Sequence, residues 1–163
     1  MDVNTGAILG LATKGDYDPN DPWTIADEDV QKEIDALPED EQEAATSVAL
    51  QKQWRNKAIS DTYYPGSVFK MCTGSMAMEE GLVSEDATFT CNYSYLVEGT
   101  GQSIHCWTAR GHGTENFVEG LCNSCNPFFV HLGELLGPQL FYKYFEAFGF
   151  TQKTGIDLPG EAT

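Results

Sequence analysis

A serine and a lysine stand three positions apart, directly behind a Pro-Gly pair, in the segment YYPGSVFKMC of residues 63–72. Residues with this spacing share one face of a helix, so a helix that begins near Ser67 places the Lys70 amine beside its hydroxyl. The N-terminus of such a helix also offers unpaired N–H groups and a positive dipole end, which suit an anionic tetrahedral intermediate. If the apolar neighbours desolvate Lys70, the pair has the chemistry of a nucleophile and its base.

The same spacing has a simpler structural explanation. Serine is a common helix N-cap and lysine a common surface residue, so an isolated S-x-x-K segment favours a cap without chemistry. The sequence around Ser67 and Lys70 therefore has to decide between a catalytic pair and a capped surface helix.

The wider segment SDTYYPGSVFK resembles the active-site segment of penicillin-binding proteins, in particular the class B D,D-transpeptidases, where S-x-x-K is the first of three motifs. The second motif of that family, S-x-N, is matched by Ser124, Cys125 and Asn126 within LCNSCNPFFVHLGELLG. MDVNTGAILGLAT resembles the strand pair that opens the family's catalytic domain, NKAISD the run before the serine, and FGFTQKTGIDLPGE a segment after the second motif. The resemblance covers nearly the whole chain in the right order.

Carried over by position, the resemblance implies that Ser67 is acylated by the D-Ala-D-Ala end of a stem peptide or by a β-lactam. It implies that Lys70 takes the serine proton, that Ser124 relays a proton to the leaving group, and that Asn126 holds the substrate amide. A short loop before a helix that begins at Pro127 can aim two small polar side chains at one point. Helix capping alone is the competing role for Ser124 and Asn126. No cofactor is required for this chemistry.

The third motif of the family, a K-T/S-G on a strand, is expected to be absent. Lys153, Thr154 and Gly155 match its letters, but IDLPG follows them and leads into a turn, and proline is unsuited to an interior strand. The segment resembles a loop in the middle of the family's domain. The resemblance thus implies that residues 1–163 are the N-terminal part of a transpeptidase domain, and that such a fragment can be inactive by itself.

Cys91, Cys106 and His112 are candidate metal ligands, because two thiolates and an imidazole suit tetrahedral zinc once a fourth ligand is added. A Cys91–Cys106 disulfide, sensible outside the cytoplasm, and free thiols are the alternatives. The spacing is not that of a standard zinc finger. Some class B relatives resemble this arrangement in holding zinc near the active-site entrance, where the metal would be structural. The remaining cysteines are expected to be small core residues: Cys72, Cys122 and Cys125.

The composition is that of a folded protein, with 41% hydrophobic and 21% charged residues in a chain of 163, a length that predicts one domain. A formal charge of -16 makes nucleic acid an improbable partner, because phosphate binding needs clustered Lys and Arg. Twelve carboxylates and one base, Lys32, lie between Asp16 and Glu43. We interpret residues 16–47 as a solvated acidic insertion.

The elements that position these residues follow from hydrophobic periodicity and from helix and turn signals. We expect two short strands in residues 1–13, helices over 26–36, 67–80, 116–122, 127–136 and 138–148, a hairpin over 88–106 with its turn at 99–101, and a loop-like tail. The predicted class is α/β (α+β): a partial penicillin-binding-protein or serine β-lactamase-like fold with helices packed on an incomplete antiparallel sheet.

The leading functional prediction is a fragment of a D,D-transpeptidase that cross-links peptidoglycan stem peptides. A serine β-lactamase and a non-catalytic β-lactam sensor or zinc-holding module are the alternatives. No run approaches the roughly 18 apolar residues of a membrane span, so the chain itself is expected to be soluble. For the full-length protein the resemblance implies a membrane anchor, a glycosyltransferase partner and a place at the extracytoplasmic face of the membrane.

Overall fold

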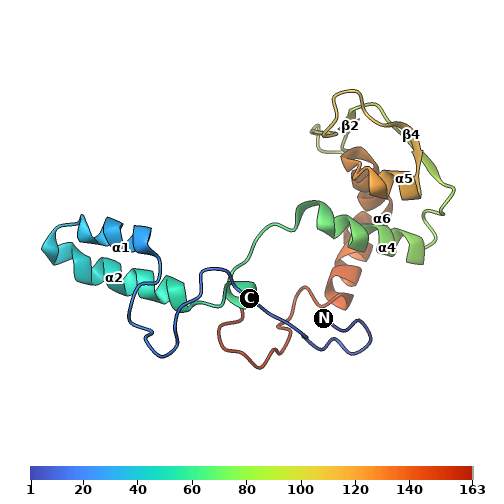
Figure 1. The fold of residues 1–163 in the computed structure, drawn as a ribbon. Helices are drawn as coiled ribbons and strands as arrows, with labels where there is room; N and C mark the ends of the chain where they lie inside the picture. The colour runs from blue at the N-terminus through green and yellow to red at the C-terminus, as the bar shows by residue number, and fades with distance from the viewer. Residues whose placement is uncertain (163) are drawn as a thin grey trace. The chain divides into compact units, whose positions relative to one another are not determined.

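The computed structural model describes residues 1–162, which form two compact units. The first, here called the acidic unit, contains residues 1–63 together with the segment that begins at Gly155. The second, here called the helical unit, contains residues 64–154. Figure 1 shows the course of the chain through both units. No helix in the described range is both long enough and apolar enough to cross a membrane.

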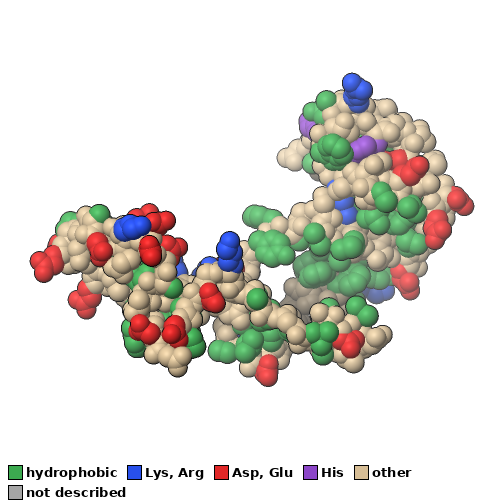
Figure 2. Space-filling model, viewed as in Figure 1, with side chains coloured by type: hydrophobic (Ala, Val, Ile, Leu, Met, Phe, Trp, Pro, Cys, Tyr) green, Lys and Arg blue, Asp and Glu red, His purple; other side chains and the backbone are tan. Residues whose placement is uncertain are grey.

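The acidic unit is built on the helices α1 (Glu28–Asp35) and α2 (Glu39–Trp54), with the short α3 (Lys57–Ser60) after them. The Asp27 side chain caps α1 by accepting hydrogen bonds from two N–H groups of its first turn. Apolar side chains bury Ile34 of α1 and Leu50 of α2. The acidic side chains cover the outside of the pair, as Figure 2 shows. The predicted insertion is therefore a helical hairpin, of which only the first helix was expected.

The two strands predicted in residues 1–13 are wrong. The Gly6 N–H donates to the Asp2 carbonyl and the Asp2 N–H to that of Ala7, both at 2.9 Å, so the predicted turn exists. The apolar residues beyond it are exposed, Leu9 by 77%, and no strand of the described chain pairs with them. An isolated two-stranded ribbon without an apolar surface to cover is only marginally stable in water.

The helical unit packs α4 (Lys70–Glu79) against α6 (Asn126–Ala147). A 3-10 turn, η1 (Gly66–Phe69), leads into α4, and Gly81 at φ 66° follows its end as predicted. Gly74 of α4 allows the Phe117 ring to approach this helix closely, because a Cβ there would lie 2.9 Å from that ring. The two helices predicted over 127–136 and 138–148 are confirmed as the two parts of α6, which a kink separates at Gly137, where the backbone is not helical (φ 68°, ψ 164°). The main buried apolar residues of the core are Met76, Ala77, Phe117, Phe128, Phe129, Leu132 and Leu136.

Four short strands form two antiparallel pairs, which confirms the mixed class and the small antiparallel sheets. The pairs are β1 (Thr88–Cys91) with β4 (Gly113–Asn116) and β2 (Ser94–Leu96) with β3 (Ser103–His105). The predicted hairpin is thus right for β2 and β3, whose connection contains the turn at 99–101, and wrong for β1. Tyr93, at φ 74°, interrupts the run between β1 and β2, so β1 pairs with β4 instead.

The hairpin of β2 and β3 is tied to α6 by one carboxylate. The Tyr95 hydroxyl donates to Glu134 Oε2 at 2.5 Å, and the Glu98 backbone N–H donates to Glu134 Oε1 at 2.7 Å. Tyr95 also lies within hydrogen-bonding distance of His131 Nδ1, at 3.1 Å. The hairpin ends at His105, whose carbonyl accepts a hydrogen bond in the site described below. The helix α5 (Phe117–Cys122) follows β4 and confirms the helix predicted over 116–122. It begins with a capping box between Asn116 and Glu119.

Candidate active site

Ser67 and Lys70 lie on successive turns of one helical segment. Gly66 adopts φ 56° and starts η1, which carries Ser67, and Lys70 is the first residue of α4. The backbone N–H of Lys70 donates to the backbone carbonyls of Ser67 and Val68, so η1 and α4 are continuous. Ser67 is exposed, and its hydroxyl makes no hydrogen bond within residues 1–162. The nucleophile predicted from the sequence is thus accessible, one turn before the predicted base.

The Lys70 ammonium reaches across to the S-x-N segment. It donates to the Ser124 carbonyl at 2.7 Å, to Ser124 Oγ at 3.0 Å and to Asn126 Oδ1 at 2.6 Å. The amide nitrogen of Asn126 donates in turn to the His105 carbonyl at 3.1 Å. This second bond orients the amide, so that its oxygen faces the lysine. The structure therefore brings Lys70, Ser124 and Asn126 together, although 54 positions separate the lysine from Ser124.

The half-buried position of Lys70 changes its acidity. Burial lowers the pKa of its ammonium, while the Coulombic attraction of nearby Cys125 and Cys106 in their thiolate forms acts in the opposite direction. The nitrogen lies 5.7 Å from the centre of the Phe129 ring, which forms one apolar wall. A lowered pKa gives Lys70 more of the amine form that a general base needs.

Ser124 has a backbone conformation that few non-glycine residues adopt, with φ 51°. It follows the end of α5, where its N–H donates to the Leu121 carbonyl at 3.1 Å and the Cys125 N–H donates to that of Gly120 at 3.0 Å. This pair of bonds is the helix-terminating pattern that usually carries glycine at the left-handed position. With serine there, both the carbonyl and the hydroxyl of one residue face Lys70.

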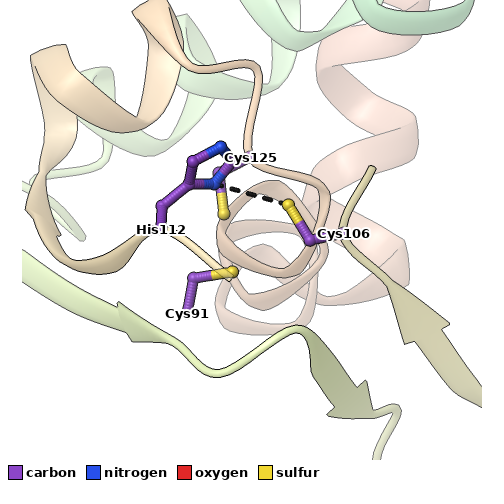
Figure 3. Close-up of side chains that lie close together, drawn as sticks. All are labelled: Cys91, Cys106, His112 and Cys125. Atoms are coloured by element: carbon purple, nitrogen blue, oxygen red, sulfur yellow. Dashed lines mark hydrogen bonds between the residues drawn. The ribbon is translucent and has the colours of Figure 1, made fainter. Parts of the chain in front are cut away.

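A cluster of three thiols and one imidazole lies next to this segment (Figure 3). The ligand atoms of Cys91, Cys106, His112 and Cys125 all lie within 4.8 Å of one another, and the sulfur atoms and the ring turn toward a common centre. Cys106 Sγ is 3.4 Å from His112 Nδ1. The three predicted ligands do meet, and Cys125 of the S-x-N segment is the fourth.

The donor set fits a zinc ion. Two ligands on one tetrahedral zinc lie about 3.5 Å apart when one is sulfur and one is nitrogen, which is close to the Cys106–His112 distance. Burial favours a higher pKa for the Cys91 thiol, but backbone N–H groups of His112 and Tyr93 and the neighbouring thiols lower it overall. Burial, followed by the carboxylate of Glu115, raises the pKa of the Cys125 thiol. A cation bound at the centre would favour the thiolate of both.

The other expectations for the cysteines have mixed outcomes. All five are free thiols, so the alternative disulfide between Cys91 and Cys106 is not formed. Cys72 is half-buried and packs against the core, as expected. The core prediction is wrong for Cys122, which is exposed on the outer side of the short α5. For Cys125 burial was expected but not its place in the cluster, since no regular spacing connects it to the other three.

Comparisons with known proteins cover the whole chain. A family model described as "Penicillin binding protein transpeptidase domain" matches residues 1–163. Stage V sporulation protein D of Bacillus subtilis is 37% identical over 165 residues, which cover 100% of this chain and 22% of the relative. Peptidoglycan D,D-transpeptidase MrdA of Acinetobacter baumannii is 26% identical over 99% of this chain and 22% of the relative. The chain thus spans about a fifth of the length of these relatives.

Solved structures show the same similarity. Penicillin-binding protein A of Mycobacterium tuberculosis, as an imipenem acyl-enzyme complex, matches with a TM-score of 0.64 and 27% identity over 88% of this chain and 32% of that chain. Penicillin binding protein 3 of the same organism, complexed with ampicillin, matches with a TM-score of 0.61 and 29% identity over 69% of this chain and 25% of that chain. Both proteins bind β-lactams, according to their descriptions.

Proposed function

The chain belongs to the family of penicillin-binding protein transpeptidase domains, and from this premise we propose that Ser67, Lys70, Ser124 and Asn126 form its acyl-transfer site. The complete protein that carries the chain is then a D,D-transpeptidase that cross-links peptidoglycan stem peptides and is acylated by β-lactams. The observation that carries the proposal is the triple contact of Lys70 with Ser124 and Asn126. Surface lysines seldom give up hydration for three protein acceptors without a functional reason.

The first half-reaction is the acylation of Ser67. In its amine form, Lys70 donates two hydrogen bonds to the S-x-N segment and keeps a lone pair, which takes the Ser67 proton. The serine oxygen then bonds to the carbonyl carbon of the penultimate D-Ala, and the bond from that carbon to the nitrogen of the terminal D-Ala breaks. Ser124, hydrogen-bonded to Lys70, passes its hydroxyl proton to the departing amine and takes the proton that Lys70 accepted from Ser67. With a β-lactam, the broken bond is the ring amide, so the leaving nitrogen stays attached.

The second half-reaction transfers the acyl group. An amine of a second stem peptide attacks the acyl carbon and loses a proton to Ser124 and Lys70. The bond between that carbon and the Ser67 oxygen breaks, and Lys70 returns a proton to this oxygen. In this proposal Asn126 binds the backbone amide of the donor peptide through its remaining N–H and oxygen lone pair. The contacts that fix its amide, with Lys70 and the His105 carbonyl, support this role.

Release of D-Ala from a stem pentapeptide by the complete protein tests this function. Ser67→Ala should abolish the release, because no nucleophile remains. Ser75→Ala is the matched control: it removes an exposed serine of the same helix, whose hydroxyl donates to the Met71 carbonyl. Full activity of Ser67→Ala, or equal loss in both variants, would refute the assignment.

We also propose that Cys91, Cys106, His112 and Cys125 hold a structural zinc ion. Three thiolates and a neutral imidazole are ligands that zinc prefers, and their mutual distances suit one tetrahedral ion. When bound, the metal supplies structural stability; acyl transfer needs only the chain's own groups. Metal analysis of protein purified under reductant should find one zinc per chain. Protein that remains folded and metal-free in the presence of excess zinc would contradict the site.

The site of action follows from the substrate. Because stem peptides are cross-linked outside the cell membrane, we propose that the complete protein is anchored with this domain on the extracytoplasmic face, where a glycosyltransferase supplies the glycan strands. Protease added to intact spheroplasts should digest the domain. Resistance of the domain until the membrane is permeabilised would contradict this location.

A further inference from the structure

The peptide group between Asn123 and Ser124 decides where Ser124 points. Rotation of this group changes φ of Ser124, and with it the direction of the Ser124 carbonyl and hydroxyl that Lys70 contacts. A serine at φ 51° is strained relative to the ordinary helical conformation by about 1–2 kcal/mol, so some contact has to hold it there.

Both ends of that peptide group are held. On one side the Ser124 N–H donates to the Leu121 carbonyl at 3.1 Å, which belongs to the end of α5. On the other side the Asn123 carbonyl accepts a hydrogen bond from the Trp107 indole Nε1 at 2.9 Å. The indole bond is the one long-range contact on this group, because Trp107 lies 16 positions earlier in the chain.

The side chain of Asn123 is fixed as well. Its amide donates to Glu115 Oε2 at 3.1 Å, and Glu115 is only 2% exposed. Asn123 therefore cannot follow a rotating peptide group without breaking a buried contact. The indole of Trp107 is 69% exposed, with its ring centre 5.4 Å from that of His112. Most of this large side chain adds little to the core, and its N–H is directed to the segment that carries Ser124.

We propose that Trp107 is a positioning residue for the acyl transfer: its indole N–H fixes the Asn123–Ser124 peptide group so that the Ser124 oxygens meet Lys70. The inference rests on the proposed function of Ser67 and Lys70. Without the indole bond the peptide group can rotate toward the relaxed conformation, which moves Ser124 Oγ away from the lysine. Reacting groups displaced by about an ångström lose much of their rate advantage.

The test replaces Trp107 by phenylalanine in the complete protein, which keeps an aromatic ring and removes the N–H. Stopped-flow acylation by a fluorescent penicillin separates the dissociation constant of the initial complex from the rate constant of acylation. We expect Trp107→Phe to lower the acylation rate constant about tenfold, the equivalent of one hydrogen bond, with the dissociation constant unchanged. The melting temperature should barely move, because the side chain is exposed.

The chain offers a matched control in Trp54, whose indole Nε1 donates to the Pro22 carbonyl at 2.7 Å within the acidic unit. Trp54→Phe removes the same kind of bond and should leave the acylation rate constant at the wild-type value. An unchanged rate constant in Trp107→Phe, or a loss found only in the dissociation constant, would overturn the inference. If the penicillin labels the wild type normally, either of these results overturns only the role of Trp107 and leaves the proposed function intact. A wild type that the penicillin does not label would refute the proposed function instead.

Discussion

Lys70 donates a 2.6 Å hydrogen bond to Asn126, and each residue is the first of its helix, α4 and α6 respectively. The two helices pack against each other through the buried side chains of Met76, Phe129 and Leu132. The position of the amine relative to the amide is therefore set by the core. Substitutions that shift α4 along α6 should damage acyl transfer even when they lie several turns from the site.

The pH dependence of acylation should report the amine form of Lys70. Because burial lowers the pKa of Lys70, the fraction of amine rises with pH and is complete at a lower pH than for an exposed lysine. The acylation rate constant of the complete protein, measured with a penicillin at a series of pH values, should rise over the pH interval in which the Lys70 ammonium loses its proton. A rate that does not change with pH in that interval would show that Lys70 is not the base. Lys70→Arg is the control: it cannot deprotonate, so the rate should fall about 10²–10⁴-fold and lose its rise.

The strain at Ser124 predicts an order of stability for two substitutions. Ser124→Gly relieves the left-handed conformation, whereas Ser124→Ala keeps it, so the glycine variant should be more stable by about 1 kcal/mol. Both lose the hydroxyl and should be impaired equally in proton relay. Denaturant unfolding of the two variants measures the difference. An alanine variant as stable as the glycine variant would mean that φ at this position is not strained.

The fourth ligand of the proposed zinc site can be tested against a neighbouring thiol. Cys125→Ser should lower zinc content, and with it the stabilisation of about 2.7 kcal/mol that a ligand provides at a hundred times its dissociation constant. Cys122→Ser removes an exposed cysteine outside the cluster and should bind zinc like the wild type. Zinc content and thermal unfolding with and without chelator decide the matter. Normal zinc content in Cys125→Ser would reduce the site to the three ligands predicted from the sequence.

The tie between the hairpin and α6 should contribute to stability through one hydroxyl. Tyr95→Phe removes the donor to Glu134, a bond to a charged acceptor, and should lower the free energy of unfolding by about 1.5–3 kcal/mol. Tyr142→Phe is the control, because Tyr142 is exposed and its only described contact is ring stacking on Phe145. Urea unfolding of both variants gives the comparison. Equal effects would show that the Glu134 contact adds nothing to the fold.

Local signals in the sequence predicted the elements that begin or end at a characteristic residue. Gly81 predicts the end of α4, and Pro127 predicts the start of α6 within one residue. These signals act within a few residues, so a single sequence contains them. The S-x-x-K and S-x-N residues were likewise found from their motifs, and the structure adds that Lys70 contacts the second motif.

The features that the sequence did not predict depend on contacts between distant residues. The helix α2 was missed because its apolar residues do not gather on one face, and Leu50 is its only buried residue. The pairing of β1 with β4 joins Thr88 to Asn116, and the hairpin of β2 and β3 lies between these two residues in the sequence. Cys125 and Trp107 acquire their proposed roles only when three segments meet around the S-x-N loop. No local pattern marks either residue.

The most direct test of the acyl-transfer site is the mass of the complete protein after incubation with a penicillin, followed by peptide mapping. The account predicts one penicillin added per chain, located on Ser67, and no addition to Ser67→Ala. An adduct on another residue, or an unmodified wild-type protein under conditions in which it is folded, would contradict the assignment of Ser67, Lys70, Ser124 and Asn126.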